Sequence, residues 1–272
     1  MFNKQKSSYI TLGILAVIVL VFMYNKTIGL ILMAIFAGYK SYTSRAAIIT
    51  LKANKAFSQN KLEESMALFE KAYHTKGCTF KEKNIYGFVN LKYGDINIAN
   101  KVFTELMSEK LDEASLNIVK NNYAMVLWKQ DRLDEAIDIL KELYNNYKTT
   151  ALYGTLGAFL IQKGNLEEAY SIILESYEYD NSDNVILDNL GQIYYLRGEN
   201  QKALEIFESL LEVKPHFPEA YYDYGKALMK EGKYSKALEL SKEALSKEFN
   251  NLSTITRNDI NEQIKLLEEK IQ

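Results

Sequence analysis

The side chains able to carry out chemistry are few in this chain of 272 residues, which contains two histidines and one cysteine. His74 and Cys78 are four residues apart, so they could share one face of a helix as two metal ligands. A structural zinc site needs four protein ligands, and the sequence offers no third candidate near this pair. Cysteine–histidine catalysis would need an orienting group in the same pocket, which nothing in the sequence indicates. We therefore expect no metal site, no catalytic residues and no cofactor.

Paired glycines raise the possibility of a phosphate-binding loop. Gly191 and Gly198 are seven residues apart, and so are Gly225 and Gly232. Neither pair is followed by the Gly-Lys-Ser/Thr sequence of a P-loop, whose lysine and hydroxyl contact the phosphates and their metal ion. The two pairs instead recur 34 residues apart. This regularity indicates packing and turn positions in a repeated structural unit.

One pattern occurs six times along the chain, at spacings of 34, 37, 33, 34 and 34 residues. Each copy has a small residue followed seven positions later by glycine, asparagine or aspartate, which tolerate the left-handed backbone that ends a helix. The small residues are Ala53, Gly87, Ala124, Gly157, Gly191 and Gly225, and the turn residues are Asn60, Gly94, Asp131, Gly164, Gly198 and Gly232. The pattern predicts helix pairs that approach closely at the small residues.

This helix–turn–helix unit resembles the tetratricopeptide repeat, whose period is about 34 residues. The resemblance covers residues 46–251 and implies an α-solenoid, with repeats at 46–79, 80–113, 117–149, 150–183, 184–217 and 218–251. Residues 252–272 carry an apolar stripe at helical spacing, and Thr256 and Asp259 resemble a capping box. We expect this segment to be a helix that caps the solenoid. A helix that binds another protein is the alternative.

Residues 1–45 differ in composition from the rest of the chain. They contain five basic residues and no acidic residue, whereas the net charge of the whole chain is −2. Their apolar stretches, 9–24 and 28–39, can be extended to helices at about 8–24 and 28–44. Such helices approach the length of about 17 to 20 residues that a membrane-spanning helix needs. We therefore expect this segment to be a membrane anchor.

The charges favour a transmembrane hairpin that turns at residues 25–27. Positive residues stay preferentially on the cytoplasmic side, and a hairpin keeps Lys4, Lys6, Lys40 and Arg45 there. A single crossing, with the other stretch at the membrane interface, is the alternative. The sequence thus predicts an all-α protein of bacterial type. Its N-terminal transmembrane helical hairpin, integral to the cell membrane, would precede the repeats and the capping helix and hold the repeats in the cytoplasm.

The resemblance further implies that the first helix of each pair lines a concave groove. Apolar and aromatic side chains with amides between them would suit an extended peptide or an amphipathic helix. The groove residues we expect are Asn54, Phe57, Asn84, Phe88, Leu91, Asn121, Met125, Trp128, Ile161, Tyr195, Tyr222 and Met229. Packing of these rings between neighbouring repeats is the alternative.

The expected function is that of a non-catalytic, membrane-anchored scaffold or adaptor that binds a protein or peptide partner. The lipid membrane would be a second partner, through residues 8–44. Nucleic acid is not an expected partner, because phosphate binding needs a basic surface and residues beyond the first 45 carry the excess of acids. The alternative is a structural protein that self-associates into a membrane-bound homo-oligomer.

Overall fold

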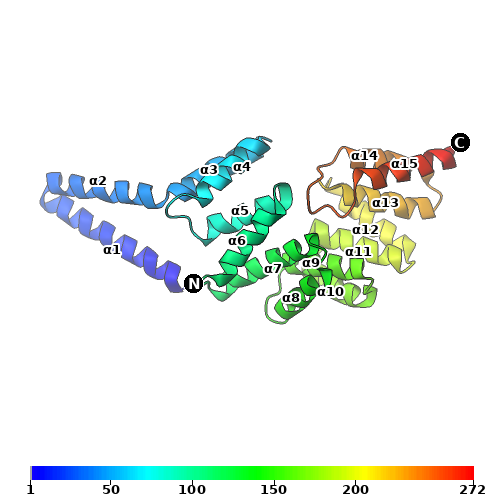
Figure 1. Cartoon of the computed structure of the whole chain (residues 1–272), viewed down its shortest axis with the longest axis horizontal. Helices are drawn as coiled ribbons and strands as arrows, with labels where there is room; N and C mark the ends of the chain where they lie inside the picture. The colour runs from blue at the N-terminus through cyan, green and yellow to red at the C-terminus, as the bar shows by residue number, and fades with distance from the viewer. Residues whose placement is uncertain (1) are drawn as a thin grey trace. The chain divides into compact units, whose positions relative to one another are not determined.

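The computed structural model describes residues 2–272, and the side chains of residues 9–272, as fifteen α-helices (Figure 1). The helices are α1 (Phe2–Tyr24), α2 (Lys26–Thr43), α3 (Arg45–Ser58), α4 (Leu62–Tyr73), α5 (Phe80–Tyr93), α6 (Ile96–Ser108), α7 (Glu113–Lys129), α8 (Leu133–Tyr144), α9 (Thr150–Lys163), α10 (Leu166–Tyr179), α11 (Asn184–Leu196), α12 (Asn200–Glu212), α13 (Pro218–Lys230), α14 (Tyr234–Leu245) and α15 (Arg257–Ile271). The chain divides into two compact units, Met1–Lys83 and Asn84–Gln272, which are described separately.

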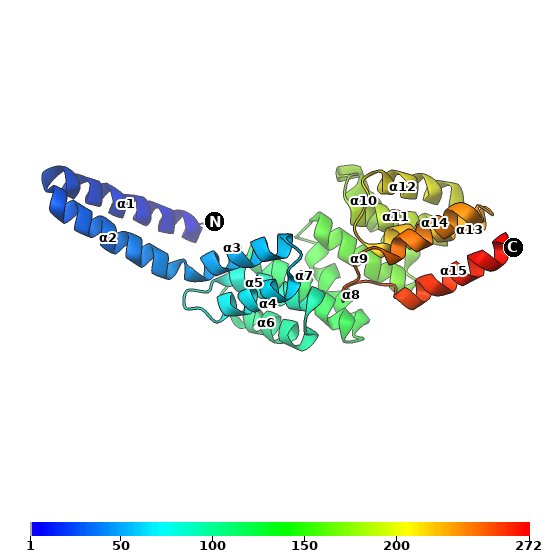
Figure 2. The same cartoon turned by 90° about the horizontal axis from the view of Figure 1, so that it is seen from above.

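In the first unit, α1 and α2 form a helical hairpin that turns at Asn25 (Figure 2). The Asn25 side-chain oxygen accepts hydrogen bonds from the backbone N–H groups of Thr27 and Ile28, at 3.1 and 3.2 Å, and so caps the start of α2. Close packing beside the turn requires Gly29, because a Cβ at this position would lie 2.3 Å from the Phe22 Cα. The polar break in the apolar sequence therefore contains the N-cap of α2, at a tight turn between the two helices.

The prediction that this hairpin crosses a membrane is wrong. None of the helices in the described part of the chain combines the length and the apolar character that a crossing requires. The physical reason is length: the uncharged stretches 9–24 and 28–39 are each shorter than a span of about 20 residues, and α2 also carries Lys26 and Lys40. Lys4 and Lys6, on which the charge argument depended, lie outside the residues whose side chains are described.

The predicted turn residues adopt the left-handed backbone at five of the six positions. Their φ angles are 58° at Asn60, 61° at Asp131, 86° at Gly164, 80° at Gly198 and 69° at Gly232. Each of these residues follows the first helix of a pair, and the chain then enters the second helix within a few residues. The repeat pattern therefore reflects the need for a left-handed backbone at the turn, which glycine, asparagine and aspartate adopt with little strain.

Two of the predicted small residues lie where the paired helix leaves no space for a side chain. A Cβ at Gly191 would lie 2.6 Å from the Phe207 ring, and one at Gly157 would lie 2.3 Å from Ile173. Both neighbours are fully buried in the apolar core of the second unit. A larger side chain at either position would hold the two helices of the pair apart.

The second unit bends so that the first helices of its pairs lie on the inner side. In this part of the structure, α9 contacts α7 and α11, and α11 contacts α13. No comparable contact joins α8, α10 and α12 to one another within the described residues, because each packs on the first helix of the following pair instead. First helices that approach while second helices spread produce curvature towards the first helices.

A long-range contact joins the two ends of the second unit. In the loop between α14 and α15, Asn251 donates its backbone N–H to the Lys92 carbonyl at 2.9 Å and its side-chain amide to the Gly94 carbonyl at 3.0 Å. The Tyr93 hydroxyl hydrogen bonds the Glu248 carboxylate. Figure 1 shows this loop beside the junction of α5 and α6. We call these hydrogen bonds the closing contact.

The last helix covers the end of the repeats, as expected of a cap. The Thr256 side chain accepts from the Asp259 backbone N–H, and the Asp259 side chain accepts from the Thr256 backbone, which completes the predicted capping box. α15 packs on α14, and Ile260 and Leu267 are fully buried. Gln263 donates to the Tyr222 carbonyl at 3.4 Å, so α15 also touches α13.

Candidate protein-binding surface

The structure places the predicted groove residues at different depths. Asn54 and Phe57 lie on α3 in the first unit and are exposed. In the second unit, Leu91 is fully buried and Asn121 is only 6% exposed, so neither offers an open side-chain surface. The remaining predicted residues are half-buried: Asn84, Phe88, Met125, Trp128, Ile161, Tyr195, Tyr222 and Met229.

Trp128 connects two neighbouring first helices. Its indole N–H donates to the Gln162 side-chain oxygen on α9 at 2.8 Å, and its ring centroid lies 5.3 Å from that of Phe159. The Lys129 ammonium lies 4.6 Å from the Trp128 ring centroid. The ring is therefore held in one orientation while part of it stays accessible, which suits an anchoring residue of a binding surface.

Asparagine side chains join successive first helices. Asn122 donates to the Asn84 side-chain oxygen at 3.1 Å, which links α7 to α5, and Asn189 donates to the Gly154 carbonyl at 2.9 Å, which links α11 to α9. The side-chain oxygen of Asn121 is buried and accepts no hydrogen bond from the described residues. The polar residues of these helices thus serve partly as links between repeats.

Three buried carboxylates gather on α11 and α13, and we call Asp188, Glu219 and Asp223 the carboxylate cluster. Each of these residues is less than 10% exposed. Asp223 pairs with the Lys226 ammonium at 3.1 Å, and Glu219 accepts a hydrogen bond from the Thr254 backbone N–H at 2.7 Å. Burial raises the pKa of Asp188 well above its usual range, and the neighbouring charges of Asp223 and Glu219 raise it further. Burial also raises the pKa of Asp223 and of Glu219.

Sequence reasoning missed this cluster, although a local signal was present. Asp188 follows Ile186 and Leu187, and Asp223 stands between two tyrosines, inside segments expected to be first helices. An acidic residue among apolar neighbours in a packed helix indicates a buried carboxylate. The packing of α13 against α11 decides which acidic side chains lie close together, and the sequence pattern does not predict that packing.

A second polar cluster surrounds Glu175 on α10. The Glu175 carboxylate accepts hydrogen bonds from Lys148 at 2.6 Å, from Tyr153 at 2.8 Å and from the Tyr144 hydroxyl. These donors hold the pKa of Glu175 at about 2. Burial and the adjacent carboxylate raise the pKa of Tyr144 to about 12. Glu175 is thus charged and Tyr144 neutral at neutral pH, and the arrangement is that of a structural link between α8, α9 and α10.

His74 and Cys78, which are too few for the metal site considered from their spacing, lie at and just after the end of the second helix of the first pair. His74 is the exposed residue that ends α4, and Cys78 is half-buried in the loop that follows. Within the described residues, no three histidine, cysteine, aspartate or glutamate side chains are grouped so that they could hold a metal ion.

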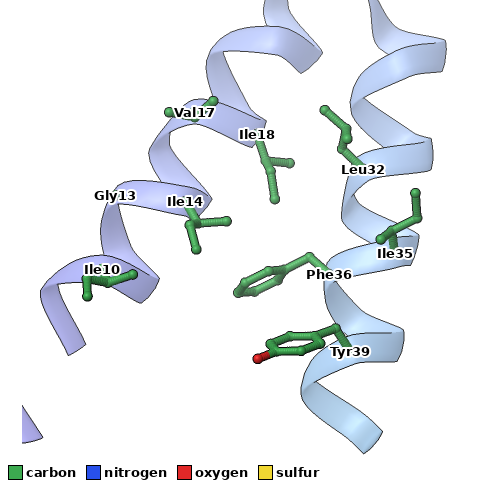
Figure 3. A pocket seen from close by; sticks show the side chains of 9 residues that line it. All are labelled: Ile10, Gly13, Ile14, Val17, Ile18, Leu32, Ile35, Phe36 and Tyr39. Atoms are coloured by element: carbon green, nitrogen blue, oxygen red, sulfur yellow. The ribbon is translucent and has the colours of Figure 1, made fainter. Parts of the chain in front are cut away.

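The hairpin of the first unit contains an apolar crevice between α1 and α2 (Figure 3). Its volume is about 620 Å³, and aliphatic and aromatic side chains of both helices line it, among them Ile14, Ile18 and Phe36. Outside the crevice the hairpin also exposes large apolar side chains, such as Leu20 at 65% and Met23 at 78%. So much apolar surface on one element indicates contact with another molecule.

Comparisons with known proteins agree with the helix-pair solenoid. A family model described as tetratricopeptide repeat matches residues 194–253. The chain superposes on the crystal structure of a tetratricopeptide repeat protein from Parabacteroides merdae with a TM-score of 0.63 and 17% sequence identity, covering 87% of this chain and 89% of that one. That likeness establishes the fold.

Two curated relatives are also described as proteins that contain this repeat. One from Methanocaldococcus jannaschii is 28% identical over 156 residues, and one from Bacillus subtilis is 26% identical over 178 residues. These matches cover 54% and 62% of this chain but only 27% and 35% of the relatives. The class of protein is thus an all-α solenoid of helix pairs. The chain contains the tetratricopeptide repeat, which the family model shows at residues 194–253. Proteins of this family generally act as non-catalytic scaffolds that bind other proteins.

Proposed function

We propose that this chain is a non-catalytic scaffold that binds a segment of a partner protein along the first helices of its second unit. The observation that carries the proposal is the set of half-buried apolar and aromatic side chains on successive first helices, with Trp128 held between α7 and α9. A surface of this kind can receive apolar side chains of an extended peptide or an amphipathic helix.

Site-specific photocrosslinking tests this proposal. A photoreactive amino acid at Trp128 should capture a specific partner in cells, since this position lies on the proposed binding surface. The matched control is the same amino acid at Asp138, an exposed position on the second helix α8. Equal products from both positions, or none from Trp128, would contradict a binding surface on the first helices.

The apolar hairpin supports a second contact, with the surface of a lipid membrane. Its exposed aliphatic side chains can enter the interface, and residues 1–45 contain basic residues and no acid, which favours anionic headgroups. Location at a cell membrane with the repeats in the cytoplasm stays a prediction. A second copy of the chain is the alternative occupant of the hairpin surface, and it would make the protein a self-associating scaffold.

Vesicle flotation distinguishes these two occupants. The full chain should float with anionic phosphatidylglycerol vesicles, and the double variant Leu20→Glu and Ile31→Glu should not, because both positions are exposed on the hairpin. Leu196→Glu, at an exposed position of α11, is the matched control and should float as the wild type does. Self-association would be favoured instead if the wild type forms an oligomer without lipid and the double variant is monomeric.

A further inference from the structure

The carboxylate cluster contains three acidic groups and one ammonium group. Asp188, Glu219 and Asp223 are buried together, and Lys226 is the ammonium that acts on both aspartates. Buried charges are tolerated when they are paired. We propose that an arginine or lysine side chain of the bound partner segment supplies the missing positive charge. This inference rests on the proposed function and specifies the chemistry of the partner.

Asp188 provides the acceptor for this cation. Its Oδ2 accepts a hydrogen bond from the Gln192 amide at 3.0 Å, whereas its Oδ1 is buried and has no hydrogen-bond partner in the described residues. A buried acceptor without a donor carries an uncompensated desolvation cost. A guanidinium or ammonium group brings several N–H donors and a positive charge, so it would satisfy both needs of this carboxylate.

The chain's own lysines show that the neighbouring surface accommodates cations. The Lys226 ammonium lies 5.3 Å from the ring centroids of both Tyr195 and Tyr222, and the Lys230 ammonium lies 4.3 Å from that of Tyr195. Aromatic faces beside a buried carboxylate attract a positive group through their quadrupole. Tyr195 and Tyr222 were both expected to face a partner, so the proposed cation site adjoins the predicted binding surface.

Lys226 also marks the entrance to the cluster. Its side chain is 35% exposed, whereas that of its partner Asp223 is 9% exposed. The partly exposed lysine therefore connects the buried Asp223 carboxylate with the protein surface. An acidic partner residue would be rejected here, because like charges repel strongly where water is scarce.

Binding of a peptide panel to the purified full chain tests the inference. The probes are short fluorescein-labelled peptides rich in apolar residues, identical except for one central residue: arginine, lysine, citrulline or glutamate. Citrulline has nearly the shape of arginine without its charge. We expect the arginine peptide to bind about tenfold or more tightly than the citrulline peptide, as charge-assisted hydrogen bonds require, and the glutamate peptide to bind weakest.

Two variants should change this preference in opposite directions. Asp188→Asn should remove most of the advantage of arginine over citrulline, while Lys226→Met, which removes the internal competitor, should increase that advantage. A purely structural role of the cluster would not produce opposite effects. Asp138→Asn, which neutralises an exposed acid on α8, is the control and should leave the preference unchanged.

The outcomes separate this inference from the proposed function. Equal affinity for the arginine and citrulline peptides would overturn the cation site, even though binding of both would support a peptide-binding surface. Failure of every peptide to bind would also overturn the cation site. The proposed scaffold function is then judged by crosslinking at Trp128, which needs no basic residue in the partner.

Discussion

Asp188 illustrates how one residue can oppose stability while serving binding. It is 6% exposed, and one of its carboxylate oxygens lacks a hydrogen-bond partner within the described structure. A carboxylate in such a place is costly in its charged form, and the cost is reduced only when the group takes up a proton or meets a cation. Natural proteins commonly retain such unfavourable groups where a ligand makes use of them.

We predict that Asp188→Asn stabilises the free protein at neutral pH, by on the order of 1 kcal/mol. The folded-state pKa of Asp188 is raised, so the folded state binds a proton more readily than the unfolded state does. The wild type therefore gains stability as the pH falls from above the raised pKa towards about 3.9, the ordinary value for aspartate. The asparagine variant lacks this gain, so its advantage should shrink on acidification.

Urea denaturation of both proteins at neutral pH and at about pH 5 measures this difference. The control Asp138→Asn changes an exposed acid and should leave the free energy of unfolding nearly unchanged at both pH values. A variant at position 188 that is less stable than the wild type at neutral pH would show that the charged carboxylate stabilises the fold.

At the scale of elements, the turn within each pair is set by backbone conformation alone. Gly164 has a φ of 86°, and a Cβ there would meet no heavy atom within 4 Å. We predict that Gly164→Ala costs about 1 kcal/mol, from left-handed strain without any clash. Gly164→Asn should cost less, because asparagine tolerates this region, and thermal unfolding of the two variants compares them. Equal losses would mean that another factor governs the turn.

The approach of paired helices depends on side-chain volume instead. At Gly191 an added Cβ would lie 2.6 Å from the Phe207 ring, which is fully buried. We predict that Gly191→Ala destabilises the protein by about 1 to 3 kcal/mol, as overpacking of a core does. A second variant, Phe207→Leu in the Gly191→Ala background, should recover part of the loss in urea denaturation. If Phe207→Leu instead lowers the free energy of unfolding further, the residues at 191 and 207 do not compete for space.

At the scale of the whole molecule, the closing contact joins residues that are 157 positions apart within the second unit. We predict that Asn251→Ala together with Tyr93→Phe loosens this contact, since both side-chain hydrogen bonds are lost. Hydrogen exchange at the residue 251 amide, which donates to the Lys92 carbonyl, should become faster. Asn258→Ala, whose hydrogen bond stays inside α15, is the control. Unchanged protection in the double variant would show that the contact contributes little to closure.

Local chemistry made much of this fold predictable from the sequence. Glycine, asparagine or aspartate at a fixed spacing indicates a left-handed backbone at the turn, and the small residues indicate close packing of the two helices. The repeats and their turns could therefore be predicted from the sequence. The cap of α2 at Asn25 and the capping box of α15 were likewise readable, because each depends on residues within one helical turn. The prediction of a membrane crossing was wrong because the uncharged stretches within these helices are shorter than a crossing needs.

The sequence by itself thus determined the helix pairs, their order and the turn chemistry, all of which depend on neighbours close along the chain. Only the tertiary structure decided that Asp188, Glu219 and Asp223 are buried together and that Asn251 meets Lys92 and Gly94. These contacts arise from small rotations between successive pairs, which accumulate along the solenoid. The repeat pattern does not contain these rotations. The excess of acidic groups in the carboxylate cluster and the closing contact can therefore be seen only in the tertiary structure.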